Sequence, residues 1–407
     1  MDIFVARQPI FNKDLTVYAY ELLFRSGFEK AVEIPDQDIA TSNVIHRSFV
    51  DIGLDDLVGG KRVFINFTDN LLKEEIASLF PPELLTVEVL ENVIPDKKII
   101  ESVINLKKKG YLIALDDFEY KDLNNPLIPH ADIIKVDFML TTEEEQFKIV
   151  QMLKHHNIKF LAEKIETRDI FEKALEWGYT YFQGFFLAKP EIKKGRGISS
   201  NKMSKLNLLI EVNKSELMIE NIETIIKHDV NLSFKLLKFM NSPHFGFKRE
   251  INSIKHALNL LGQREVKKWI NIITLNDIGD DKPAEITREA LRRGKFLENI
   301  GLINKNCKDS SEFFFLGMFS KLDCIVGLPM DQILKDFPIS TDVKNAILGV
   351  EDSNYKKLLD LIINFDKGDW ELVHKTNNYF KLSEPEVVKS YKEAVSWSDL
   401  IMNSNVI

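Results

Sequence analysis

The sequence has few of the features that mark exported or membrane proteins. Its only two cysteines, Cys307 and Cys324, exclude a disulfide framework, and no nearby cysteine or histidine completes a metal-binding set with them. We expect both thiols to be buried apolar side chains. No apolar run approaches the roughly 20 residues of a membrane-spanning helix. The first residues also lack the basic start and cleavage site of a signal peptide. We therefore expect a cytoplasmic protein that does not contact a membrane.

An excess of positive charge is also missing. The chain has 54 Lys and Arg against 62 Asp and Glu, and the formal net charge is −8. This balance argues against a nucleic-acid partner. With 44% hydrophobic and 29% charged residues, the composition is that of an ordinary globular protein. A length of 407 residues exceeds the usual size of a single hydrophobic core, so we expect at least two domains.

The first half of the chain alternates between strand and helix patterns. Two strands, 2–10 and 17–25, are joined by a short polar turn and should be antiparallel. Further strands are expected at 61–67, 84–91, 111–115, 131–138, 158–166 and 179–190, and helices at 36–51, 69–79, 96–109, 142–156 and 167–177. Eight strands with helices between most of them predict an α/β fold. The expected architecture is a (β/α)₈ TIM-like barrel with an antiparallel first strand, over residues 1–192.

The second half has a different pattern. Residues 193–202 are polar and contain glycine, which is typical of a linker. From residue 203 to 407, apolar residues recur at three-and-four spacing and strand patterns disappear. We expect an all-α domain of eight to ten helices there.

Polar residues lie near the C-terminal ends of seven expected barrel strands. They are Glu21, Asn66, Glu88, Glu91, Asp116, Asp117, Lys135, Asp137, Glu163, Glu166 and Gln183. The C-terminal ends of barrel strands meet at one mouth, where active sites of this fold lie. One buried carboxylate is usually structural, but six or more at one mouth need cations to neutralise them. Oxygen ligands suit Mg²⁺, Mn²⁺ or Ca²⁺ better than Zn²⁺.

The adjacent pair Asp116 and Asp117 could serve two cations together. Two divalent ions about 4 Å apart are typical of phosphoester hydrolysis. In such a site Lys135 would orient or deprotonate the attacking water, or neutralise phosphate charge. These residues predict a two-metal site and leave the role of the lysine open.

These polar residues fall within a series of motifs that resembles the EAL domain. The motifs are QPI (8–10), YELLFR (20–25), FINF (64–67), VEVLE (87–91), ALDDF (114–118), IKVD (134–137), AEKIET (162–167) and QGFFLAKP (183–190), in that order. The resemblance covers about residues 1–195. It implies a (β/α)₈ barrel with an antiparallel first strand that hydrolyses the bacterial messenger cyclic di-GMP to pGpG with Mg²⁺ or Mn²⁺.

The resemblance also implies a role for each matching residue. Glu21, Asn66, Glu88 and Asp116 would bind the first metal, and Asp116 would bridge to the second, with Asp117 and Glu163. Lys135 would hold the attacking water and Gln183 would lie close to it. Arg25 would contact a phosphate of the ligand and Gln8 would lie near a guanine. Glu91, Glu166 and Asp137 would not bind the metals themselves but would hold the ligands and their loops in place.

Three positions depart from the family pattern. Leu22 replaces an alanine, which leaves the neighbouring acid in place. Lys164 replaces a glycine beside Glu163; it could pair with that acid or point outward, and strand alternation favours outward. The loop at Glu119–Leu123 lacks the glycines of active relatives, which a loop with positive φ would need. Ligand binding without turnover and a scaffold role therefore stay open beside hydrolysis.

The helical half resembles the HDOD domain, a helical relative of HD phosphohydrolases without their metal ligands. The resemblance rests on IIKHDVNLSFKLLKFMNSPHFGF (225–247), INSIKHALNLLGQREVKKWI (251–270) and FFLGMFSKLDCIVGLPM (314–330). In the dipeptide His228-Asp229 we expect the aspartate to start a helix, not to bind a metal. The resemblance implies a regulatory module that binds a protein partner. EAL domains often pair through the barrel, so a homodimer is also a hypothesis.

Overall fold

The computed structural model describes residues 3–26, 58–184, 200–214, 219–241, 251–303, 310–335 and 337–403; for some residues at the ends of elements, Arg25 among them, only the backbone is described. The chain divides into two compact units. One comprises Met1–Lys189 together with Ile363–Lys392, and the other Pro190–Ile362 together with Glu393–Ile407. The domain boundaries expected from the sequence stay a prediction. Across the described ranges, no helix combines the length and apolar character needed to cross a bilayer.

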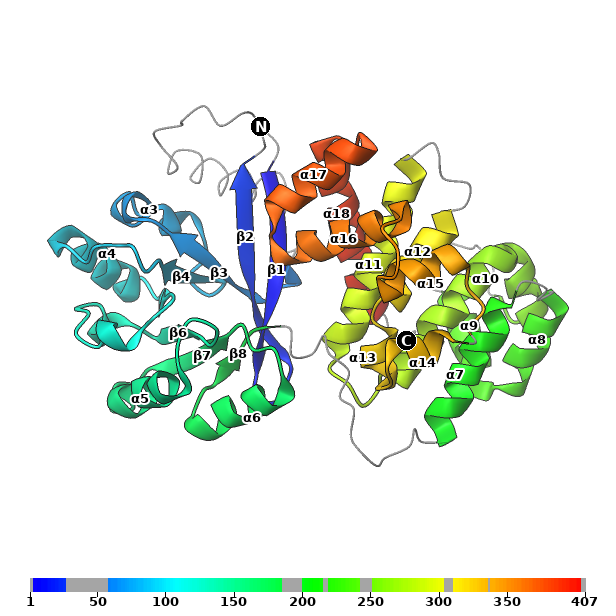
Figure 1. The fold of residues 1–407 in the computed structure, drawn as a ribbon, viewed down its shortest axis with the longest axis horizontal. Coiled ribbons are helices and arrows are strands. Elements are labelled where there is room, and N and C mark those ends of the chain that lie inside the picture. The colour runs from blue at the N-terminus through cyan, green and yellow to red at the C-terminus, as the bar shows by residue number, and fades with distance from the viewer. Residues whose placement is uncertain are drawn as a thin grey trace. The chain divides into compact units, whose positions relative to one another are not determined.

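Eight strands close into a barrel in sequence order, which confirms the expected fold (Figure 1). They are β1 (Ile3–Asn12), β2 (Val17–Ser26), β3 (Arg62–Phe67), β4 (Leu85–Val89), β5 (Leu112–Leu115), β6 (Ile133–Asp137), β7 (Lys159–Glu163) and β8 (Tyr181–Phe182). β1 is antiparallel to both β2 and β8, and the other neighbours are parallel. Of the expected last strand, 179–190, only two residues are extended in the described part, and 185–190 lie outside it.

Helical segments lie between the strands of the barrel. They are α3 (Asp69–Lys73), η2 (Ile76–Leu79), α4 (Lys97–Lys108), η3 (Tyr120–Asp122), η4 (Ile128–His130), α5 (Glu143–Leu153) and α6 (Arg168–Trp177). The expected helix 69–79 is two pieces, because Glu75 has a left-handed backbone with φ 52°. Three main helices begin with side-chain caps from Asp96, Thr142 and Thr167. The expected helix 36–51 lies outside the described residues.

Two hydrophobic layers stabilise the barrel. The outer layer fills the space between the strands and the surrounding helices, and it includes Ile65, Val87, Ile113 and Val136. The inner layer closes the barrel interior and consists of Ile10, Ala19, Phe64, Ala114, Ile133, Leu161 and Tyr181. Strand residues alternate between these two layers, which is why most of the strands read as continuous apolar runs.

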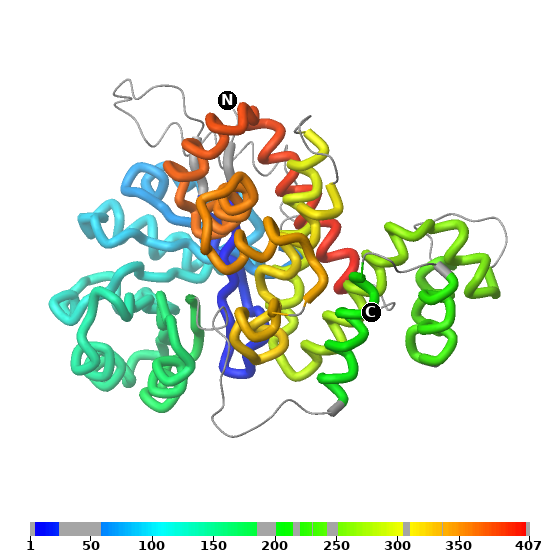
Figure 2. The backbone as a smooth tube through the Cα atoms, turned by 45° about the vertical axis from the view of Figure 1, so that its right-hand side comes forward, coloured from blue at the N-terminus to red at the C-terminus, as the bar shows by residue number. Residues whose placement is uncertain are grey.

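The rest of the described chain is helical, as expected. The helices are α7 (Ser200–Asn213), α8 (Ile219–His228), α9 (Val230–Met240), α10 (Ile254–Ile278), α11 (Ala284–Ile303), α12 (Ser310–Phe319), α13 (Leu322–Val326), α14 (Met330–Leu334), α15 (Thr341–Leu348), α16 (Asn354–Lys367), α17 (Trp370–Phe380) and α18 (Glu384–Asn403). Helices α7 to α10 share one hydrophobic cluster and are drawn in green in Figure 2. The expectation of eight to ten helices is wrong, because the described part from residue 200 onward has twelve. Single-turn helices such as α13 and α14, which are separated at Gly327, are too short to show a helical repeat of apolar residues in the sequence.

Two smaller expectations concern the helical half. Asp229 is the N-cap of α9 and accepts hydrogen bonds from the backbone of Asn231 and Leu232, so its expected structural role is confirmed. The ring of His228 bonds the Thr224 carbonyl within its own helix, at 2.7 Å. Cys324 is buried, as expected, and burial raises the pKa of its thiol to about 12. Cys307 lies outside the described residues.

Candidate functional site

The polar site of the barrel lies one side-chain layer above its apolar floor. In a strand, residues two positions apart point to the same face. Advancing two residues from the inner apolar layer gives Glu21, Asn66, Asp116, Lys135, Glu163 and Gln183, and going back two along antiparallel β1 gives Gln8. On β4 the same step leads from buried Thr86 to buried Glu88. The strand period therefore assembles the polar layer from six strands and from the residues directly after β5 and β8.

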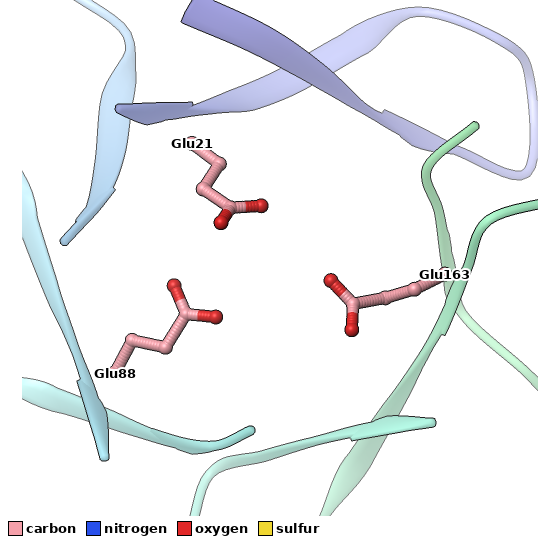
Figure 3. A group of neighbouring side chains, drawn as sticks. All are labelled: Glu21, Glu88 and Glu163. Atoms are coloured by element: carbon pink, nitrogen blue, oxygen red, sulfur yellow. The ribbon is translucent and has the colours of Figure 1, made fainter. Parts of the chain in front are cut away.

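Lys135 is the centre of this layer. Its ammonium Nζ lies 2.8 Å from Asp116 Oδ1, 2.8 Å from Glu163 Oε1 and 3.8 Å from Glu21 Oε2, and it contacts Glu88 directly. Its side chain is 1% exposed. Figure 3 shows Glu21, Glu88 and Glu163 pointing toward one another from three different strands. Four carboxyl groups thus surround one buried ammonium.

The crowding of buried acids raises the pKa values of two of them, Asp116 and Glu163. Burial, together with the neighbouring charges of Glu163, Glu21 and Asp117, raises the pKa of Asp116 to about 10. Burial also raises the pKa of Glu163 to about 7, although Lys135 opposes the shift. A single ammonium does not neutralise four buried carboxylates, so this layer binds protons at neutral pH in the absence of another cation.

Two unsatisfied acceptors test whether a divalent cation fits this layer. Glu88 is 0% exposed, and its Oε2 atom and the buried Oδ1 of Asn66 have no hydrogen-bond partner among the described residues. Asn66 and Glu88 are register partners on β3 and β4. Ligand atoms of Glu21, Glu88 and Glu163 lie within 4.8 Å of one another. Oxygen donors in this geometry suit a hard divalent cation, and such an ion would satisfy both buried acceptors.

A second carboxylate group lies beside the first. Ligand atoms of Glu91, Asp116 and Asp117 also lie within 4.8 Å of one another. The backbone turns sharply at the adjacent pair Asp116 and Asp117 (the diacid), because Asp117 has a φ of 42° in the left-handed region. Aspartate tolerates that region better than most residues do. Glu91, expected behind the ligands, is therefore placed where it could bind a second cation directly.

Two glutamines connect the acids to one wall of the site. Gln183 Nε2 donates to Glu21 Oε2 at 2.7 Å and to Gln8 Oε1 at 3.1 Å. Gln8 and Glu21 are register partners on β1 and β2. The side chain of Arg25, the other expected ligand contact, lies outside the described residues.

The glycine-free loop after the diacid is ordered by its own side chains. Residues Tyr120–Asp122 form one 3₁₀ turn, and Glu119 and Asp122 cap each other reciprocally. The Glu119 backbone amide donates to Asp122 Oδ2 at 3.0 Å. The positive φ of this region falls on Asp117 and not within 119–123, so the loop conformation needs no glycine there.

The expectation that Lys164 points outward is wrong. Its backbone has φ 53°, which breaks the strand alternation on which that expectation rested. The side chain lines the site cavity, and its ammonium contacts Asp137. Asp137 also accepts hydrogen bonds from the Met139 and Leu140 amides, at 2.7 and 3.1 Å. The family glycine at this position was the available signal, because it marks a backbone that strands rarely adopt.

A cavity of about 480 Å³ opens above the polar layer. Its lining brings together expected and unexpected residues. The expected ones are Gln8, Glu21, Asp116, Asp117, Lys135, Glu163, Glu166 and Gln183, and the unexpected ones are Leu23, Met139, Lys164, Gly184 and Lys367. Lys367 could not be found from the sequence, since it follows an ordinary helical pattern far along the chain. The volume falls within the range of small-ligand sites.

Comparisons with known proteins find one family in each half of the chain, as the sequence pattern predicts. The family model of the EAL domain matches residues 21–190, and that of the HDOD domain matches residues 201–332. The chain is similar to the uncharacterized protein YuxH of Bacillus subtilis, with 35% identity over 99% of this chain and 100% of YuxH. It is also similar to the cyclic di-GMP phosphodiesterase CdgJ of Vibrio cholerae, with 33% identity over 97% of this chain and 92% of CdgJ.

Among solved structures, the chain resembles a manganese and cyclic di-GMP complex of BlrP1 from Klebsiella pneumoniae. The identity is 21%, the match covers 46% of this chain and 55% of that one, and the TM-score is 0.39.

Proposed function

The chain belongs to the EAL and HDOD families, and we propose on this premise that its barrel hydrolyses cyclic di-GMP to pGpG with divalent cations. The observation that carries the proposal is the polar layer of the barrel. It places one buried lysine among four carboxyl groups and leaves two buried acceptors without a hydrogen-bond partner in the described part of the chain. Such a site has the charge and the ligand types that phosphodiester chemistry needs.

The ligands divide into two sets. Glu21, Asn66, Glu88 and Asp116 would hold one cation; Asp116 and Asp117 would hold the other, with Glu91 or Glu163. We propose Mg²⁺ or Mn²⁺ as the ion. A bound divalent cation supplies charge to stabilise the phosphate and lowers the pKa of water.

The protein groups position the reaction. Lys135 Nζ is held by its carboxylate contacts, and we propose that it would orient the attacking water. Glu163, whose carboxylate contacts Lys135 Nζ at 2.8 Å, would help to orient that water or the second cation. Gln183 Nε2 donates to Glu21 Oε2 at 2.7 Å, and we propose that its side chain would lie close to the same water.

Incubation of the purified protein with cyclic di-GMP and Mn²⁺, followed by chromatography, tests the proposal. We expect pGpG from the parent protein and none from Lys135→Ala or Glu21→Ala. The matched control is Lys148→Ala, an exposed lysine paired with Glu144 on α5. Turnover of the parent protein no greater than that of Lys135→Ala would overturn the proposal. Parallel calorimetry with Ca²⁺ measures nucleotide binding separately from turnover.

Two further expectations stay predictions from the sequence. They are a protein partner for the helical domain and pairing of two barrels. Size-exclusion chromatography with light scattering measures the second directly.

A further inference from the structure

The C-terminal end of α16 and the glycine that follows it belong to the same compact unit as the barrel. We call Asp366, Lys367 and Gly368 the 366–368 turn. It lies beyond the residues that either family model matches, which end at 190 and 332. In Figure 1 it is found where α16 and α17 approach β1 and β2.

Hydrogen bonds and close packing join this turn to the mouth of the barrel. Gln8 Nε2 donates to the carbonyl oxygens of Asp366 and Lys367, at 3.4 and 3.3 Å. Gly368 packs against Leu23, two residues after the metal ligand Glu21. A Cβ atom added to Gly368 would lie 2.6 Å from Leu23 Cδ1, and its φ of 72° also favours glycine. A larger residue at position 368 would therefore have to displace the Leu23 side chain and adopt a backbone conformation that favours glycine.

Packing within the unit holds the turn in one conformation. Phe365 lies directly before it and packs edge-on against Trp370 and close to Tyr391, with ring centroids 5.1 and 4.3 Å apart. Asp369 directly after it caps α17 by accepting from the Leu372 amide. Because buried aromatic residues and a helix cap flank it, the turn is a fixed wall of the cavity and not a loose loop.

Lys367 adds a positive charge to a cavity dominated by acids. Five carboxylates line this cavity: Glu21, Asp116, Asp117, Glu163 and Glu166. Its other two cations are Lys135 and Lys164. Cyclic di-GMP carries two phosphodiester charges, and the cations proposed for the polar layer would neutralise the one that is cleaved. The cavity keeps about 480 Å³ with the turn in place, so the turn leaves room for a ligand.

We propose that Lys367 is a substrate-binding residue for the phosphate that is not cleaved, and that the turn carbonyls fix Gln8 toward the nucleotide. The inference rests on the proposed function. Glu21, Gln183, Gln8 and the turn form one continuous hydrogen-bonded series. The turn thereby connects the far wall of the cavity to a metal ligand.

Lys367→Ala in the full-length protein tests this proposal. The matched control is Lys375→Ala, an exposed lysine on α17 that does not line the cavity. We expect the Kd for cyclic di-GMP with Ca²⁺, and the KM with Mn²⁺, to rise about 3- to 10-fold for Lys367→Ala, with kcat within about twofold. The salt dependence of KM should also weaken. Lys375→Ala should match the parent protein.

Unchanged constants in Lys367→Ala would overturn the proposal. Tighter binding or faster turnover would also overturn it, and would show that the turn obstructs the site. If the parent protein lacks turnover, the proposed hydrolysis fails, but the Ca²⁺ binding comparison still decides the role of Lys367.

Gly368→Ala tests the position of the turn independently of charge. Its control is Gly349→Ala, which has a similar φ of 68° but no atom closer than Lys356 Cε at 3.7 Å. We expect Gly368→Ala to raise KM by a similar factor while its circular dichroism stays that of a folded protein. Equal KM values for the two variants would contradict a turn that fixes Gln8.

Discussion

Replacing Lys135 with methionine removes the one ammonium that four carboxyl groups share. The side chain is 1% exposed, and Asp116 and Glu163 both lie 2.8 Å from its Nζ. Methionine keeps a similar length and an apolar stem, so the change removes charge and little volume. The variant therefore measures how strongly the acidic layer depends on a cation.

The magnitude follows from the burial of the group. Removing one partner of a buried ion pair destabilises a protein by about 3–5 kcal/mol, because the remaining charge stays buried. A solvent-exposed pair contributes about 0–1 kcal/mol. The matched control is Lys148→Met, whose partner Glu144 has a side chain that is 74% exposed. We expect Lys135→Met to destabilise the metal-free barrel by several times more than this control does.

Mn²⁺ should reverse part of this loss. A divalent ion bound by Glu21, Glu88 and Glu163 would supply positive charge close to the position that Lys135 Nζ occupied. An ion at 100 times its Kd stabilises the folded state by about 2.7 kcal/mol. Turnover should still be absent, because the group that positions water is gone.

Thermal unfolding with and without Mn²⁺ measures the effect. The two compact units can unfold separately. The barrel transition is therefore identified first, in the parent protein, as the one whose Tm rises when cyclic di-GMP is added. The double variant Glu88→Gln/Lys135→Met should recover stability, since one buried acid is then removed. The reasoning is refuted if Lys135→Met and Lys148→Met shift the barrel transition equally and Mn²⁺ changes neither.

Three further predictions concern pH, packing and thiol reactivity. The folded protein holds the Glu163 proton more tightly than the unfolded chain, since its pKa is raised from 4.5 to about 7; the metal-free barrel should therefore lose stability as pH rises from about 5 to 8. A Tm that rises over this range would contradict this, as would a fall in Glu163→Gln as steep as in the parent protein; a shallower fall is expected there because the pKa of Asp116 is also raised, to about 10. Gly184→Ala places a Cβ 2.3 Å from the Ile165 carbonyl oxygen, so its Tm should fall well below that of Gly59→Ala, where no atom lies within 4 Å. Mass spectrometry should find Cys324 unmodified by a thiol reagent at pH 8 in the folded protein, because burial raises its pKa to about 12. Rapid native-state labelling would contradict the buried position.

Local patterns in the sequence predicted the strands and the acids well, for a physical reason. A buried parallel strand needs a continuous apolar run, and a polar residue at its end is conspicuous. Glu88 and Asp116 stand out in this way, and the two-residue strand period brings them to one layer. The same periodicity failed for Lys164, because a left-handed backbone interrupts the alternation.

The sequence alone thus determined the barrel, the all-helical second half and the acidic mouth, because each depends on residues close together in the chain. Only the tertiary structure showed that Lys164 contacts Asp137, that Glu91 joins the diacid, and that Lys367 lines the cavity. The Gln8 contact with Lys367 joins residues 359 positions apart. No local pattern encodes such a contact, because it depends on the packing of the whole unit and not on the preference of any segment.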